Sequence, residues 1–232
     1  MSKIYVGETP ISAVFMGGKR YGVRVGYDRL LPAGYTQLEY VEATGTQYID
    51  TGITASYSIG VVADFQFTVL RSGQNLFQVY SGNASSWMIT VLMMTNYSVV
   101  VDEMSFYSTY CPTYGTKIDA ANLNRHSLSF NKNNDYAVSF DGIAKSIEPP
   151  QRTMSNITAT MCLFAKKIEG GGINEYAKMK LYSCSMYDSG MLVRNFIPAK
   201  RDSDSKIGLY DTVSKTFFTD ANGGNFIGGD PV

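Results

Sequence analysis

Residues 31–53 read LPAGYTQLEYVEATGTQYIDTGI, and their composition points to the fold class of the whole chain. Glycines bound the turns of this segment, Thr and Tyr are frequent, and the apolar residues show no helical period. Residues 48–53 alternate between apolar and polar side chains, as a half-buried strand does. We therefore predict that these residues form the first strand of a β-sandwich.

The same succession of short strands and turns continues to the end of the chain. Asp141-Gly142 stands between two apolar runs and is among the strongest signals of a two-residue hairpin. Further turns are predicted at 131–134, at the glycines of 170–172 and at 188–190. Many short strands with regular turns favour a sandwich or jelly roll over a parallel α/β fold. The expected strands are 38–43, 47–53, 59–70, 75–81, 86–94, 97–102, 126–131, 135–140, 143–148, 158–166, 177–188, 192–198, 207–211 and 216–219, and only 118–123 suggests a helical turn.

Residues 1–30 have a different organisation. Three short apolar runs, 4–6, 11–16 and 21–25, are separated by turn signals. Three short strands cannot bury a core of their own, so this segment must pack on the main domain or on a partner. We predict a small β arm for docking over 1–30 and a jelly-roll β-sandwich over 31–232. The candidate docking residues of the arm are Ile4, Tyr5, Val6, Val14 and Phe15.

Composition excludes several classes of partner. Lys plus Arg and Asp plus Glu both total 20, so net charge gives no argument for nucleic acid or an anionic membrane. No apolar run is long enough to span a membrane, and the first residues lack the apolar core of a secretory signal. We therefore expect synthesis in the cytoplasm without a signal peptide. Charged residues make up only 17% of the chain, which suits a protein that buries surface against neighbours.

The three cysteines are Cys111, Cys162 and Cys184. An odd number at wide spacing does not form a disulfide framework. Free cysteines are among the most buried residues, so we expect structural thiols. A disulfide bond between Cys162 and Cys184 remains an alternative if their strands are neighbours.

No catalytic constellation emerges from the polar residues. His126 is the only histidine, and its place at the head of an alternating strand favours a structural role. A glycosidase of a β-sandwich fold needs two carboxylates that flank the scissile bond. The clustered acids show no such alternation on an aromatic strand, so we expect no enzymatic activity, catalytic residue or cofactor. These clusters are Asp102 with Glu103, Asp202 with Asp204, and Asp50 with Glu39 and Glu42.

Aromatic residues in the middle of the chain are the best candidates for ligand binding. Trp87 is the only tryptophan, and Tyr107, Tyr110 and Tyr114 follow it within the irregular stretch 104–124. Irregular loops on a β scaffold often carry binding sites, and aromatic rings offer apolar faces to sugars. We predict a carbohydrate-binding platform from these four residues. The alternative, packing in the core or between subunits, stays open.

Several segments resemble a known fold family. Residues 125–130 (RHSLSF) and 136–142 (YAVSFDG) resemble the middle hairpin of laminin-G-like, concanavalin-A-like jelly rolls. Residues 161–165 and 179–187 resemble the next strand and a late strand of that family. The resemblance covers residues 38 to 200 approximately and implies an all-β jelly roll. Many laminin-G-like domains bind calcium through acidic residues at a sheet edge, but no matching pair is found here, so no metal is expected.

A second resemblance is narrower and concerns context. TGTQYIDTGI (44–53), LYSCSMYDSGMLVRNFIPAKR (181–201) and IGLYDTVSKTFFTDANGGNFIGG (207–229) resemble jelly-roll domains of tailed-phage and prophage structural proteins. KIYVGETPISAVFMGGKRYGV (3–23) is similar to N-terminal attachment segments of phage tail, fibre and appendage proteins.

These resemblances imply a virion structural protein that is made in the host cytoplasm. It would be a tail, fibre or capsid appendage or decoration protein, attached through the arm to other virion proteins. Its lectin-like jelly roll would bind host surface glycan, and the protein would be a homo-oligomer, with a trimer expected by family analogy. The alternatives are a bacterial glycan-binding adhesin module and, less favoured, a glycan hydrolase of the same fold.

Overall fold

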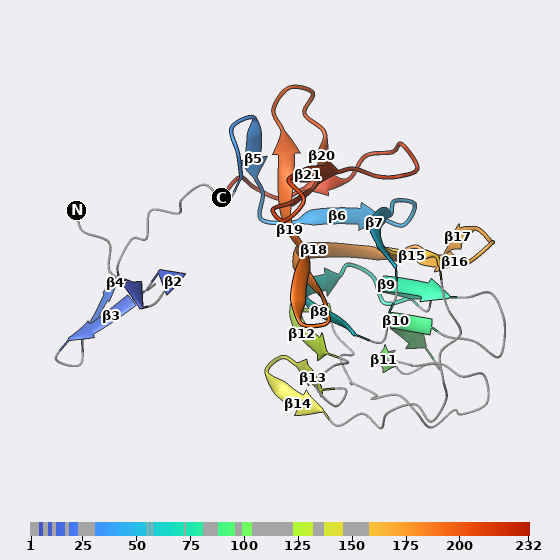
Figure 1. The fold of residues 1–232 in the computed structure, drawn as a ribbon, viewed down its shortest axis with the longest axis horizontal. Helices are drawn as coiled ribbons and strands as arrows, with labels where there is room; N and C mark the ends of the chain where they lie inside the picture. Colours follow the sequence, from blue (N-terminus) through green and yellow to red (C-terminus); the bar gives the residue numbers. More distant parts are fainter. Residues whose placement is uncertain are drawn as a thin grey trace. The chain divides into compact units, whose positions relative to one another are not determined.

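All the regular structure that the computed structural model describes is β-strand. The structure describes residues 5–6, 9–10, 13–16, 19–22, 31–54, 56, 58–71, 73–80, 88–95, 99–103, 123–131, 137–145 and 158–232. These residues contain no helix, which confirms the predicted all-β class. The chain divides into two compact units, Met1–Pro32 and Ala33–Val232 (Figure 1).

The first unit, the arm, consists of two short hairpins. In one, β1 (Tyr5–Val6) pairs antiparallel with β2 (Thr9–Pro10). In the other, β3 (Ala13–Met16) pairs antiparallel with β4 (Lys19–Gly22). In the sequence, two residues separate the paired strands of each hairpin, and the first of the two is a glycine.

The second unit, the sandwich, contains two sheets. The larger sheet comprises β5 (Tyr35–Gln37), β6 (Val41–Thr44), β8 (Ile59–Phe67), β12 (His126–Asn131), β13 (Ala137–Phe140), β14 (Ile143–Lys145), β18 (Lys178–Asp188), β19 (Met191–Arg201), β20 (Ile207–Asp211), β21 (Thr216–Phe218) and β22 (Ile227–Gly228). Its main strand order is β14-β13-β12-β8-β18-β19-β20-β21; in addition, β5 pairs with β19, β6 pairs with β18, and β22 pairs with β6.

The smaller sheet has the strand order β11-β10-β9-β15-β7 along its main path, and β16 and β17 join it beside β9. Its strands are β7 (Ile49–Thr54), β9 (Gln74–Tyr80), β10 (Met88–Thr95), β11 (Val99–Glu103), β15 (Thr160–Leu163), β16 (Lys166–Ile168) and β17 (Ile173–Asn174). Late strands occupy central positions in both sheets, because β15 lies between β9 and β7, and β18 lies beside β8. Both sheets therefore close only when the last third of the chain is in place.

Strand alternation places one hydrophobic core between the two sheets. On β8, every second residue from Ile59 to Phe67 is buried. From Val62 onward, the residues between them point away from the core and are partly or fully exposed. β18 supplies four buried residues, and a register shift between Leu181 and Ser183 keeps its apolar side inward. The smaller sheet adds Ile49, Phe77, Val79, Met161 and Leu163. Burying each large apolar side chain stabilises the fold by about 1.5–3 kcal/mol.

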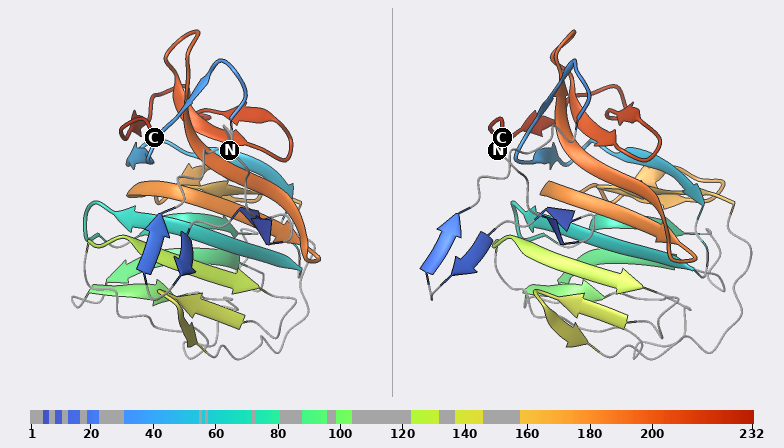
Figure 2. Two further views of the ribbon diagram at one scale, coloured as in Figure 1. Left: turned by 90° about the vertical axis from the view of Figure 1, so that its left-hand side faces the viewer. Right: turned by 60° about the vertical axis from the view of Figure 1, so that its left-hand side comes forward.

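β19 connects the body of the sandwich to a small extension. Its first half pairs with β18, and its second half pairs with β5 and β20. The β18–β19 hairpin, in orange, is prominent in both views of Figure 2. Phe196 lies at the transition, fully buried and edge-on to Phe218, with ring centroids 5.3 Å apart. β5, β20, β21 and the end of β19 thus form the edge of the larger sheet opposite β14.

Most predicted strands coincide with observed ones, but two predictions were wrong in their boundaries. The predicted strand 158–166 is divided into β15 and β16, because Phe164 has a φ of +68° and interrupts the extended chain. The predicted strand 38–43 spans the break between β5 and β6. The Asp141-Gly142 hairpin turn is confirmed, with φ values of +50° and +76°. Residues 118–122 of the predicted helical turn lie outside the described residues.

Candidate functional site

The predicted docking residues that the structure describes lie on the first strand of each arm hairpin. Tyr5 and Val6 form β1, and Val14 and Phe15 lie in β3, while Ile4 is outside the described residues. Tyr5 pairs with Pro10, and Phe15 pairs with Arg20. Such small hairpins are at best marginally stable alone, so the arm has to be completed by contacts with something else.

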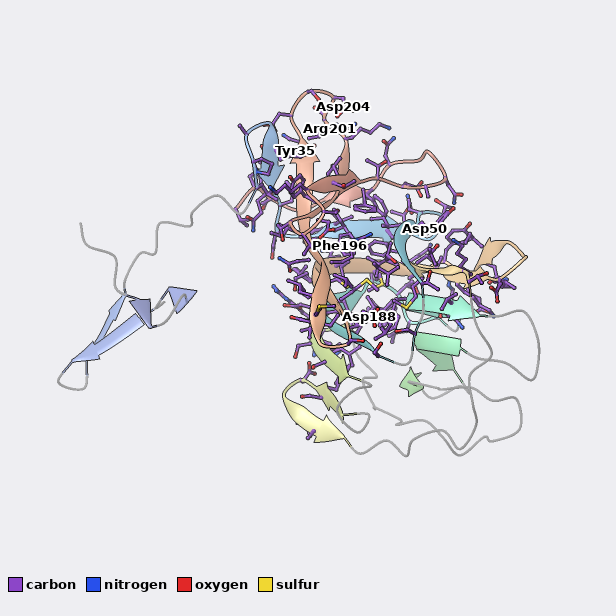
Figure 3. The ribbon with its side chains drawn as sticks, in the orientation of Figure 1. Tyr35, Asp50, Asp188, Phe196, Arg201 and Asp204 are labelled. Carbon is purple, nitrogen blue, oxygen red and sulfur yellow. The ribbon has the colours of Figure 1, made fainter. Side chains whose placement is uncertain are left out.

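The sandwich begins with a strand that is held on both edges. Tyr35, the first residue of β5, pairs with Arg201 of β19. Beyond that pair, the backbone N–H of Asp202 donates to the carbonyl of Gly34 at 2.9 Å, and Thr36 Oγ1 donates to Asp202 Oδ1 at 2.7 Å. Figure 3 shows Tyr35, Arg201 and Asp204 close together at one end of the sandwich.

The other edge of the same segment pairs with residues 227–232. The Val232 N–H donates to the Gln37 carbonyl, and the Glu39 N–H donates to the Asp230 carbonyl at 2.8 Å. Two glycines permit this approach, because a Cβ on Gly229 would lie 2.8 Å from the Tyr40 ring. A Cβ on Gly228 would lie 2.6 Å from a Leu38 methyl carbon. The first strand of the sandwich is therefore anchored by pairing on both edges.

The outer face of the larger sheet carries a cluster of tyrosines and cations. The Arg125 guanidinium lies over the Tyr182 ring at 3.8 Å, and the Lys180 ammonium lies over the Tyr40 ring at 4.0 Å. The two tyrosines meet edge-on, with centroids 5.6 Å apart. Arg125 also binds Asp64 through two nitrogens, at 2.7 and 2.5 Å. We call these five residues the tyrosine–cation surface.

Hydrogen bonds and burial fix the polar groups of this surface. The Tyr182 hydroxyl donates to Gln66 Oε1 at 2.8 Å. Partial burial raises the pKa of Tyr182, and the Asp64 carboxylate raises the pKa of Arg125. Both planar polar groups of this surface thus have a partner: the Tyr182 hydroxyl pairs with Gln66, and the Arg125 guanidinium pairs with Asp64.

Two buried carboxylates organise the turns near the end of the chain. Asp211, fully buried, accepts hydrogen bonds from the N–H groups of Asn195, Val213 and Ser214. Asp220 accepts from the N–H groups of Tyr48, Asn222 and Gly224. Burial alone would raise the pKa of Asp211, but these hydrogen bonds outweigh it and the pKa is lowered. Both carboxylates are occupied by backbone amides, as in structural turns.

The single histidine lies in a structural environment. His126 is buried, and its Nδ1 is 2.7 Å from Asp141 Oδ2. Asp141 also accepts from the Ser127 N–H at 2.8 Å, which ties the β13–β14 turn to the head of β12. The imidazole packs against the Phe140 ring, with centroids 4.9 Å apart.

The other acidic residues that the sequence singled out form separate hydrogen bonds and ion pairs where the structure describes them. Asp50 binds Lys167 Nζ at 2.6 Å; burial opposes its charge, but this bond and its other hydrogen bonds lower its pKa. Asp204 forms a two-bond pair with Arg201, which lowers the pKa of Asp204 to about 2. The side chains of Asp102 and Glu103 lie outside the described side chains.

The described cysteines are buried free thiols. Cys162 of β15 and Cys184 of β18 are both fully buried and lie in different sheets. Burial raises the pKa of each thiol to about 12, so neither forms a thiolate near neutral pH. Cys111 lies outside the described residues.

The predicted carbohydrate-binding residues cannot be placed. Trp87, Tyr107, Tyr110 and Tyr114 all lie outside the described residues. Within the described ranges, no group of three or more His, Cys, Asp or Glu side chains could hold a metal ion. In the same part of the chain, no apolar helix reaches membrane-spanning length.

Reasoning from sequence missed the tyrosine–cation surface. Alternation along β18 gives a signal for half of it, because Lys180 and Tyr182 are the outward positions beside buried Leu181. The meeting of Tyr182 with Tyr40 and Arg125 depends on pairing of β18 with β6 and β8, which no local pattern encodes. No model of a known protein family matches the chain, and a search of curated proteins finds no significant match.

Proposed function

We propose that this chain is a non-enzymatic structural protein of a tailed-phage or prophage virion. The arm attaches to another component of the tail, fibre or capsid, and the sandwich is displayed as a lectin-like head. The observation that carries this proposal is the division of the chain into an arm of two short hairpins and a sandwich with its own core. Residues 35–40, at the start of the sandwich, are paired on both edges within the head. The proposed localisation is therefore the virion.

The head is proposed to be a concanavalin-A-like, laminin-G-like jelly roll. Two features support this finer assignment. The chain passes repeatedly from one sheet to the other, and nearly all strand pairs are antiparallel. Late strands are inserted between early ones in both sheets, as Greek-key connections require.

Deleting residues 1–30 tests the docking role of the arm. We expect the truncated protein to be lost from purified particles, because the proposed contact with the virion has been removed. The sandwich should keep its thermal unfolding transition, since Ala33–Val232 is a compact unit with a core cluster of its own. Quantitative immunoblotting of particles, together with calorimetry of the purified protein, measures both.

The matched control for this experiment is Ile143→Thr, which removes an exposed apolar side chain from β14 of the head. It should enter particles at the wild-type level. Normal incorporation of the truncated protein would contradict the docking role.

Glycan binding by the head is a second proposed activity. It is supported by the tyrosine–cation surface, where two aromatic rings stand beside a guanidinium–carboxylate pair. Neutral saccharides present apolar C–H faces and hydroxyl pairs, which match these two kinds of group.

A broad glycan array with the full chain tests this activity. We expect saccharide binding that weakens roughly tenfold in Tyr182→Ala, and also in Trp87→Ala or Tyr110→Ala if the sequence-predicted platform takes part. Tyr187→Ala, on the same strand β18, is the control and should bind normally. If the folded wild-type protein binds no saccharide on the array, the proposed glycan binding is wrong and the proposed structural role in the virion stands alone.

A further inference from the structure

The first strand of the sandwich is the middle strand of a small three-stranded ladder. On one edge, residues 34–38 bond to residues 198–202. On the other edge, residues 37–42 bond to residues 227–232. The middle strand is antiparallel to both neighbours, so the hydrogen bonds of the ladder lie across the strand direction.

The direction of the strands decides how a pull on the chain is carried. The chain enters the ladder at Tyr35, opposite Arg201, which is the end of β19 that lies away from the β18–β19 turn. A pull on the preceding chain that is resisted at the β18–β19 turn therefore runs parallel to the strands and loads the hydrogen bonds together. Val232 lies opposite Gln37, so it leaves the ladder at the end where Tyr35 enters. A pull between Tyr35 and Val232 therefore opens the ladder one bond at a time.

Aromatic side chains hold the strands of the ladder in place. The Tyr35 ring packs against Tyr210 and Phe217, with ring centroids 4.9 and 5.2 Å away. Phe226, which immediately precedes the third strand of the ladder, is buried in the core and packs against Phe164. The middle strand cannot slide without breaking these ring contacts as well as its hydrogen bonds.

We propose that this ladder is a mechanical clamp, which keeps the sandwich folded when the chain before residue 34 is pulled. Tension on the arm reaches residue 34 through the covalent chain. The proposal rests on the proposed function, in which the arm carries a displayed head. It assigns the head's resistance to force to residues 34–42 and their two neighbouring strands.

Constant-force spectroscopy of the full chain tests the clamp in two pulling geometries. One handle is at the N-terminus in both. The second handle is on a cysteine introduced by Met191→Cys, beside the β18–β19 turn, or by Val232→Cys; the native side chains are 68% and 74% exposed. Both chains also carry Cys111→Ser, and their remaining native thiols, Cys162 and Cys184, are fully buried.

The sandwich should stay folded roughly tenfold longer or more in the Met191 geometry than in the Val232 geometry at the same force. Several hydrogen bonds have to break together in the first geometry, whereas they break one at a time in the second. The chain before residue 34 is common to both geometries, so its extension cancels. The two chains should have the same thermal transition, which excludes a difference in stability as the cause.

Gly229→Val tests the second edge of the ladder. A Cβ on Gly229 would lie 2.8 Å from the Tyr40 ring, so the larger side chain should push residues 227–232 away from the middle strand. The lifetime in the Met191 geometry should then fall toward that of the Val232 geometry. Gly172→Val is the matched control, because a Cβ there meets nothing within 4 Å, and it should keep the full lifetime.

Equal lifetimes in the two geometries, or a longer one in the Val232 geometry, would overturn the clamp. A folded Gly229→Val variant that lasts as long as the wild type would do the same. These failures are distinct from failure of the docking role. A chain that gives equal lifetimes but is lost from particles on deletion of residues 1–30 refutes the clamp and keeps docking, and the reverse pair of results refutes docking and keeps the clamp.

Discussion

Replacing Gly208 with alanine is expected to destabilise the sandwich by roughly 3 kcal/mol, at the upper end of what overpacking costs. Gly208 lies in β20, where an added Cβ would stand 2.1 Å from the carbonyl oxygen of Phe218 and 3.1 Å from the Phe217 ring. The first neighbour is backbone, so no rotamer change relieves the contact. The β20–β21 pair would have to separate, and Phe218 would lose its position beside Phe196.

Thermal and urea unfolding of the purified chain measure this effect. A loss of about 3 kcal/mol lowers Tm by roughly 6–12 °C in a domain of this size. Gly172→Ala is the matched control, because its Cβ would meet nothing within 4 Å and its φ is not positive. It should change stability by less than about 0.5 kcal/mol. Equal Tm values for the two variants would contradict the prediction, because they would mean that β21 can move away from Gly208 at little cost in stability.

The fold class could be predicted because local chemistry encodes strands and turns. Residues 178–188 alternate in the sequence as they do in the structure, and Asp141-Gly142 adopts the left-handed conformations that a two-residue hairpin needs. Phe164 shows the limit of this reasoning. Nothing about a phenylalanine predicts a φ of +68°. Here the Phe164 N–H donates to the Leu76 carbonyl at 2.9 Å, and the Phe164 ring packs against Phe226, which together maintain this conformation.

The candidate sites were harder to predict because they depend on pairing across the chain. Tyr40 meets Tyr182 only after β6 and β18 have paired, and residues 227–232 meet residues 37–42 only when the sandwich closes. The Asp211 site is another that depends on pairing across the chain. Val213 and Ser214, which donate to its carboxylate, are close in sequence, but the third amide donor, Asn195, comes from β19.

Asp211→Ala is the second large effect we expect, a loss of about 3–4 kcal/mol at pH 7. The carboxylate accepts three backbone N–H bonds and the Ser214 hydroxyl, and Arg194 Nε lies 3.6 Å away. Removing it leaves those buried donors without their acceptor, and unmet buried groups cost far more than a hydrogen bond normally contributes. Urea unfolding compares the variant with the wild type. Asp204→Ala, which removes an exposed pair with Arg201, is the control and should change stability little.

The pH dependence separates loss of charge from loss of packing at Asp211. Its pKa is lowered on folding, so the stability that its charge contributes is present above the unfolded value near 3.8 and is lost as pH falls through the folded pKa. The stability difference between wild type and Asp211→Asn should therefore be constant from pH 7 to about 5 and shrink below about 4. Taking the difference cancels the contribution of the other carboxylates. A difference that stayed constant down to acid denaturation would mean that shape and amide geometry, rather than the negative charge, hold the β20–β21 turn against β19.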